Sequence, residues 1–70
     1  MRPMVYQSQV REYRLRAGVS QEELARELGV SRQTIFNIER GLSQPKVLLA
    51  MALGVALGAT VYELFREQAS

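Results

Sequence analysis

The sequence predicts an all-α fold, a compact domain of five helices. Three observations support this prediction. Apolar residues recur at the three- and four-residue spacing that places side chains on one face of a helix. Serine or threonine residues suited to helix capping precede several of these segments, and glycines suited to helix termination follow several of them. The chain has 70 residues, near the size at which one core provides only modest stability, so a single domain is expected.

The first helix is expected from residue 9 to about residue 17. Ser8 can cap its start, and Gly18 can end it in the left-handed conformation that glycine adopts easily. Residues 1–7 form an N-terminal arm, which is expected either to be loose or to use its β-prone apolar residues to pair or pack against a second subunit. The inward face of this helix is predicted to carry Val10, Tyr13, Arg14 and Ala17.

Residues 21–40 are expected to form two short helices joined by a tight turn. Ser20 and Glu23 have the spacing of a capping box, in which each side chain binds a backbone amide of the other residue. Gly29 suits the left-handed residue that ends the first helix, and Ser31 can cap the second, which fills the rest of the stretch. The apolar residues predicted to hold the two helices in place are Leu24, Ala25, Leu28, Val30, Ile35 and Ile38.

Two more helices are expected after a loop at residues 41–45. The first spans residues 46–57, and the second spans residues 61 to about 68. Thr60 and Glu63 repeat the capping-box spacing at the start of the last helix. The inward face of that helix is predicted to carry Val61, Leu64 and Phe65.

The predicted helix at residues 46–57 is apolar on both sides. A helix that is hydrophobic all round is normally buried all round, and a contiguous apolar stripe marks an interaction site more often than scattered apolar residues do. We therefore expect a homodimer interface on its outer side, with Leu15 and Tyr62 at the border. The residues expected to face the core are Val47, Ala50, Gly54 and Leu57. Those expected in the dimer interface are Leu48, Ala52 and Val55.

Composition excludes several classes of function. The chain has no cysteine and no histidine, so disulfides, thiol catalysis and the usual zinc sites are not predicted. It also lacks an acidic pair and a glycine-rich phosphate loop, and no enzyme, cofactor or small-molecule ligand is predicted. Residues 1–5 contain no apolar run long enough for a signal peptide. The apolar run at 47–57 is shorter than the ~20 residues of a membrane span. A cytoplasmic location without a membrane partner is therefore expected. The isoelectric point of 9.5 is typical of nucleic-acid-binding domains.

The stretch at 21–40, QEELARELGVSRQTIFNIER, resembles the helix-turn-helix of the phage-repressor and Cro-like (XRE-type) family of DNA-binding domains. The match includes Gln21 at the first helix start, Ala25 where the helices cross, Gly29 at the turn and the apolar positions named above. It extends over about residues 8–65. The resemblance implies a lambda-repressor-like domain at residues 8–68 and a transcriptional regulator that binds double-stranded DNA, most simply a repressor.

The resemblance also implies that the second helix of the motif enters the major groove. Amides at Gln33 and Asn37 can bind adenine, the guanidinium of Arg32 can bind guanine, and Thr34 or Phe36 can contact a thymine methyl. Further residues are expected at phosphates, because helix N-termini attract anions and the following loop can flank the groove. The complete set of predicted DNA-binding residues is Gln21, Ser31, Arg32, Gln33, Thr34, Asn37, Arg40 and Ser43.

Two charged residues occupy inward helical positions. Arg14 lies on the inward stripe of the first helix, and Glu39 follows inward Ile35 by four residues. An unpaired buried charge costs several kcal/mol, which predicts an ion pair between them. The resemblance implies the same pair, so Arg14 is expected to be structural rather than a phosphate contact.

A homodimer would read a near-palindromic operator with half-sites about 10 base pairs apart. The alternative is a protein-interaction module, or an antitoxin-like protein, that uses the apolar outer side of the 46–57 helix to bind a different partner.

Overall fold

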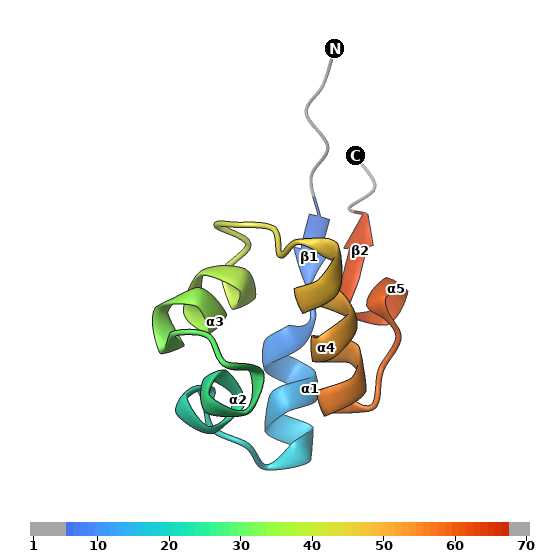
Figure 1. Cartoon of the computed structure of the whole chain (residues 1–70). Helices are drawn as coiled ribbons and strands as arrows, with labels where there is room; N and C mark the ends of the chain where they lie inside the picture. Colours follow the sequence, from blue (N-terminus) through green and yellow to red (C-terminus); the bar gives the residue numbers. More distant parts are fainter. Residues whose placement is uncertain (1–5, 68–70) are drawn as a thin grey trace.

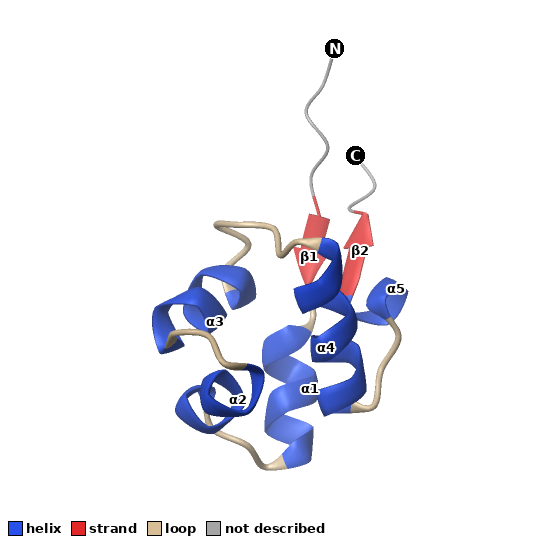
Figure 2. Ribbon diagram, in the orientation of Figure 1, coloured by secondary structure: helices blue, strands red, loops and turns tan. Residues whose placement is uncertain are grey.

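Residues 6–67 are described by a computed structural model, and they form five helices and two short strands (Figures 1 and 2). The helices are α1 (Val10–Ala17), α2 (Gln21–Leu28), α3 (Arg32–Glu39), α4 (Val47–Leu57) and α5 (Val61–Leu64). The strands are β1 (Tyr6–Ser8) and β2 (Phe65–Glu67), one at each end of the described chain. The predicted five-helix architecture is therefore confirmed, with a small sheet added to it.

The two strands correct the prediction for the C-terminal helix. That helix was expected to reach about residue 68, but α5 ends at Leu64 and β2 pairs antiparallel with β1, with Gln7 opposite Arg66. A backbone hydrogen bond of 2.8 Å from Gln9 N to Leu64 O leads into this pairing. A helix this short gains few internal hydrogen bonds, so pairing with the N-terminal strand satisfies more of the backbone. The end of the predicted arm thus pairs within its own chain, and residues 1–5 lie outside the described part.

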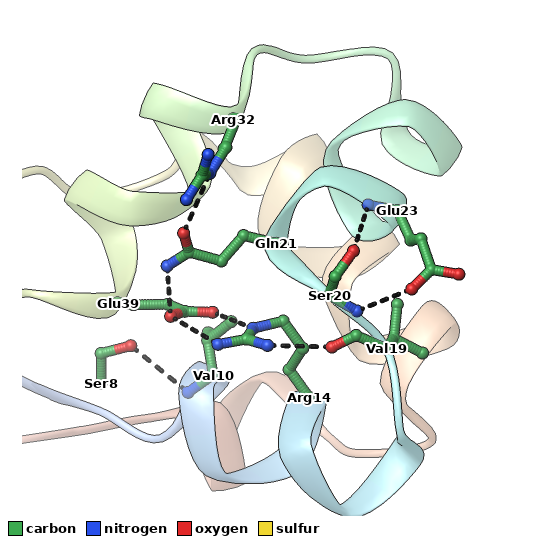
Figure 3. A network of polar contacts seen from close by, with 9 residues as sticks. All are labelled: Ser8, Val10, Arg14, Val19, Ser20, Gln21, Glu23, Arg32 and Glu39. Atoms are coloured by element: carbon green, nitrogen blue, oxygen red, sulfur yellow. Dashed lines mark hydrogen bonds and ion pairs between the residues drawn. The ribbon is translucent and has the colours of Figure 1, made fainter.

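The capping residues explain where most helices begin. Ser20 Oγ accepts a hydrogen bond from Glu23 N at 3.0 Å, and Ser20 N donates to Glu23 Oε1 at 3.0 Å, which completes the predicted capping box. The donation from the Ser20 backbone holds the pKa of the Glu23 carboxyl below its ordinary value. Ser8 does not take the N-cap position predicted for it, because it ends β1 and Gln9 is the N-cap of α1. Its Oγ still accepts a hydrogen bond from Val10 N, the first amide of the helix, at 3.4 Å (Figure 3).

A small apolar core lies where the helices meet, and its largest members have less than 2% of their surface exposed: Val10, Leu24, Ile35, Ile38, Leu53 and Leu64. Three residues predicted to face inward are instead exposed: Ala17, Val47 and Val61. Val47 was misplaced, and Leu53 missed, because α4 is apolar on every side and its spacing does not select a buried face.

Close contact between α4 and the chain that follows it depends on Gly54. A Cβ atom at this position would lie 2.6 Å from the backbone oxygen of Ala59, so no larger residue fits without a backbone shift. Helix α4 packs against α1, α2 and α5, while α2 and α3 pack closely on each other in the other half of the domain (Figure 1). The surface described below lies on this second half.

Candidate nucleic-acid interface

Helix α3 is anchored on one side and open on the other. Ser31 caps its start, since Ser31 Oγ accepts from Thr34 N at 3.1 Å. Ile35 and Ile38 are buried in the core, with 0% and 1% of their surface exposed. The remaining side of the helix therefore faces outward, as the sequence predicts.

Polar side chains on this outward side are held by one another. Gln33 Nε2 donates to Asn37 Oδ1 at 3.0 Å, one helical turn apart. The hydroxyls of Ser31 and Thr34 lie 2.9 Å apart. Each pair restricts the rotamers of side chains that would otherwise be free in water, so the surface is partly organised before any ligand arrives.

An aromatic residue interrupts the polar surface. Phe36 has 36% of its surface exposed, and the guanidinium carbon of Arg40 lies over its ring, 5.5 Å from the centroid. Such an arrangement is a cation–π contact, which fixes both side chains relative to each other.

A hollow of about 240 Å³ lies beside α3. It is lined by Gln21, Arg32, Gln33 and Phe36. Its volume is below the roughly 300–1,000 Å³ of ordinary small-molecule sites, so it suits the edge of a base or a single functional group better than a free ligand.

Arg14 and Glu39 lie together beneath this surface (Figure 3). Arg14 Nε donates to Glu39 Oε2 at 2.6 Å and Arg14 Nη2 donates to Glu39 Oε1 at 3.3 Å, with only 9% and 2% of the two side chains exposed. Arg14 Nη1 also donates to Val19 O at 2.9 Å. The guanidinium is thus engaged inside the fold, which makes it a structural cation.

Gln21 connects the buried pair to the first residue of α3. Its Nε2 donates to Glu39 Oε1 at 2.9 Å, and its Oε1 accepts from Arg32 Nε at 3.4 Å (Figure 3). An ionised carboxylate can only accept hydrogen bonds, so the amide nitrogen must face Glu39 and the amide oxygen must face Arg32. The sequence predicts a phosphate contact for Gln21 and does not reveal this link, because the link joins helix ends that only tertiary packing brings together.

The loop between α3 and α4 contributes the last predicted residue, Ser43. Ser43 is exposed in this loop, and Lys46 is exposed at the N-cap position of α4. The structure thus places four predicted residues on the outward side of α3, with Arg40 at the C-cap and Ser43 on the adjoining loop. The four are Arg32, Gln33, Thr34 and Asn37.

The outer side of α4 is a second exposed surface. Leu48 and Val55 have 81% and 86% of their surface exposed, whereas Ala52 is half-buried. Val47, which was predicted to face the core, and Met51 are also exposed on this helix. None of the eleven residues of α4 carries a charge.

Two other kinds of site receive no support from the described residues. Among residues 6–67, no group of three or more acidic, histidine or cysteine side chains is placed to hold a metal ion. The helices in this part of the chain are all too short or too polar to cross a membrane.

Comparisons with known proteins agree on one family. The sequence model of the helix-turn-helix family matches residues 10–64. An HTH-type transcriptional regulator of Methanothermobacter thermautotrophicus is 47% identical over 49 residues, which cover 70% of this chain and 71% of the relative.

Solved structures share the fold. The restriction-modification controller protein C.AhdI from Aeromonas hydrophila aligns with a TM-score of 0.73 and 35% identity, covering 81% of this chain and 86% of that one. SinR, a master regulator for biofilm formation solved in complex with DNA, aligns with a TM-score of 0.70 and 29% identity, covering 77% and 87%. Two other solved chains are longer, since the matching region makes up 62% and 54% of them.

Proposed function

The chain belongs to the helix-turn-helix (HTH_3) family of DNA-binding transcriptional regulators, and we propose that it acts as a cytoplasmic repressor that reads a near-palindromic operator as a homodimer. The observation that carries this proposal is the outward side of α3, where polar side chains are held in place above a buried scaffold. An α-helix of this kind fits the major groove, in which the four base pairs are distinguishable. Binding, rather than catalysis, is what this surface supports.

Base reading centres on Gln33 and Arg32. Because Asn37 uses only one N–H of the Gln33 amide, the other N–H and the oxygen stay able to bind N7 and N6 of adenine. Because Gln21 uses only Nε of Arg32, both terminal nitrogens of that guanidinium stay able to bind O6 and N7 of guanine. Thr34 lies in the same first turn and reaches the neighbouring bases or the backbone.

Phosphates are held around this reading surface. The N-termini of α2 and α3 present free backbone amides, and Gln21 and Ser31 lie at those ends. Arg40 and Ser43 extend the contact from the end of α3 into the loop. Phosphate contacts set the register of α3 in the groove but carry no sequence information themselves.

DNA binding is tested by mixing the purified chain with a pool of random duplexes at low salt and following an electrophoretic shift. We expect a shift with the pool and, after several rounds of selection, a single enriched motif with two-fold symmetry. A chain that shifts no duplex at any salt concentration would overturn the proposal. Loss of transcription from a promoter carrying the enriched motif, in a purified transcription reaction, would establish repression, whereas increased transcription would show that the chain activates.

We further propose that the dimer forms through α4. The exposed apolar side chains of Leu48 and Val55, with half-buried Ala52 between them, favour a partner surface of the same kind. A two-fold dimer places two α3 helices about one DNA turn apart, which accounts for half-sites about 10 base pairs apart.

Sedimentation or light scattering tests the dimer. Leu48→Glu or Val55→Glu is expected to give a monomer that retains helical circular dichroism, while Leu42→Glu, at a residue exposed in the loop rather than on α4, is expected to leave the dimer intact. A wild-type chain that is monomeric at high concentration would contradict the dimer and favour the alternative, in which α4 binds a different protein.

A further inference from the structure

Phe36 is an apolar residue on a surface that is otherwise polar. Its neighbours Ile35 and Ile38 fill the core, but Phe36 has 36% of its surface exposed on the outward side of α3. Leaving an aromatic ring in water forgoes the stabilisation that burial provides, so the position is more easily explained by a contact made when α3 is bound to its target.

The ring forms the apolar wall of the hollow beside α3. Gln21, Arg32 and Gln33 supply its other walls, all of them polar. Arg40 lies over the ring at 5.5 Å from the centroid and limits the rotation of the side chain. The hollow therefore presents an aromatic surface next to the amide that the proposed function assigns to adenine.

The major groove offers few apolar partners for such a surface. Among the base edges there, the C5-methyl group of thymine is the apolar one, and Phe is a side chain known to contact it. We propose that this hollow receives one thymine methyl group per half-site, which makes Phe36 a specificity-determining residue. The inference rests on the proposed function, since it requires α3 to lie in the major groove.

Gln33 sets where that thymine lies. Its side chain and the Phe36 ring are one turn apart on α3 and line the same hollow, so they meet the same or adjacent base pairs. The thymine is thus expected within one step of the adenine that Gln33 binds. Neither a guanine nor a cytosine carries a methyl group at the corresponding edge, so the ring would discriminate against G·C pairs at that position.

Replacing thymine by deoxyuridine removes the methyl group and changes nothing else in the pairing edge. Burial of one such group corresponds to about a fourfold change in affinity, from about 0.8 kcal/mol converted at about 1.4 kcal/mol per tenfold. The loss of affinity should appear at one thymine in each half-site, and replacement of the other thymines should leave the affinity unchanged.

The experiment uses the wild-type chain on its selected duplex, with each thymine replaced in turn by deoxyuridine. It measures the dissociation constant of the substituted duplex divided by that of the unsubstituted duplex. The ratio does not depend on the overall affinity of the protein. We expect a ratio of about four at one position per half-site for wild type, a ratio near one there for Phe36→Ala, and an intermediate ratio for Phe36→Leu. Leu42→Ala, at an exposed apolar residue of the following loop that does not line the hollow, should keep the wild-type ratio.

The outcomes separate the inference from the proposed function. A wild-type chain that binds its duplex with a ratio of one at every thymine would overturn the methyl contact and leave DNA reading intact. A ratio of four that persists in Phe36→Ala, shown to be folded by circular dichroism, would assign the methyl contact to another residue and equally overturn the inference. A wild-type chain that binds no duplex would instead overturn the proposed function on which the inference rests.

Discussion

Replacing Glu39 with alanine should be among the most destabilising single changes in the chain. The Glu39 side chain is 2% exposed and accepts hydrogen bonds from Arg14 Nε, Arg14 Nη2 and Gln21 Nε2. The substitution leaves the Arg14 side chain, which is only 9% exposed, without its counter-charge. Breaking a buried pair from one side costs about 3–5 kcal/mol. A domain of 70 residues has roughly 4–10 kcal/mol of total stability, so a large share of it would be lost.

Urea unfolding followed by far-ultraviolet circular dichroism measures this change. All variants should be compared at one protein concentration, because dimer formation would make the midpoint concentration-dependent. Glu12→Ala is the matched control, since its carboxylate pairs with Arg16 at 3.0 Å but is 57% exposed. That variant should lose at most about 0.5 kcal/mol. A loss below about 1 kcal/mol for Glu39→Ala would refute the buried pair as a structural element.

A double replacement separates the stability lost with the ion pair from the penalty of leaving one buried charge unpaired. Arg14→Met with Glu39→Leu removes both charges and keeps apolar volume in the space. If the penalty in Glu39→Ala comes from an uncompensated charge, the double variant should recover most of the lost stability. A double variant as unstable as the single one would show that the hydrogen bonds to Val19 and Gln21, rather than the charge balance, hold this part of the fold.

Three other measurements test the reading surface and the helix caps. Gln33→Ala should weaken binding to the selected duplex by about 1–3 kcal/mol and change binding to random duplex little, and equal losses on both would show that Gln33 does not read sequence. With some 3–4 phosphate contacts per half-site, a plot of log affinity against log salt should have a slope near about −5 to −7, whereas a flat plot would contradict electrostatic binding altogether. The pKa of Glu23 is lowered by hydrogen bonds in the folded chain, so its contribution to stability is present above its ordinary pKa of 4.5 and is lost as pH falls through the lowered value. Acid titration of stability should therefore be shallower in Glu23→Gln, and an unchanged profile would contradict the role of this cap.

Local patterns predicted most of the fold because the signals are local. The capping boxes at Ser20 and Thr60 follow from residues three positions apart, and both form as expected. The left-handed helix ends at Gly18 and Gly29 depend on a single residue type each. The positions of Arg14 and Glu39 on inward stripes likewise follow from helical spacing, and the structure has the two side chains in contact.

Non-local pairing explains the errors. Phe65–Glu67 has no local feature that excludes a helix, and its strand partner, β1, lies at the opposite end of the chain. The buried side of α4 could not be identified either, since every side of that helix is apolar and only the packed domain shows that Leu53 is inside and Val47 outside. At the candidate interface, the residue types on α3 were predictable, but the contacts of Gln21 required the relative placement of two helices.

The link through Gln21 means that scaffold and reading surface cannot be altered separately at Glu39. The carboxylate orients the Gln21 amide, and the amide oxygen then holds Arg32 Nε, so loss of the carboxylate frees an arginine on the proposed DNA surface as well as destabilising the core. Gln21→Ala removes the link but leaves the Arg14 contacts of Glu39 in place. Its effect on stability should therefore be small compared with that of Glu39→Ala. If both Gln21→Ala and Glu39→Ala bind less selectively at the base that Arg32 reads, the cause is the lost orientation of the Arg32 side chain. Destabilisation of the core does not explain the loss in Gln21→Ala, because that variant leaves the buried pair intact.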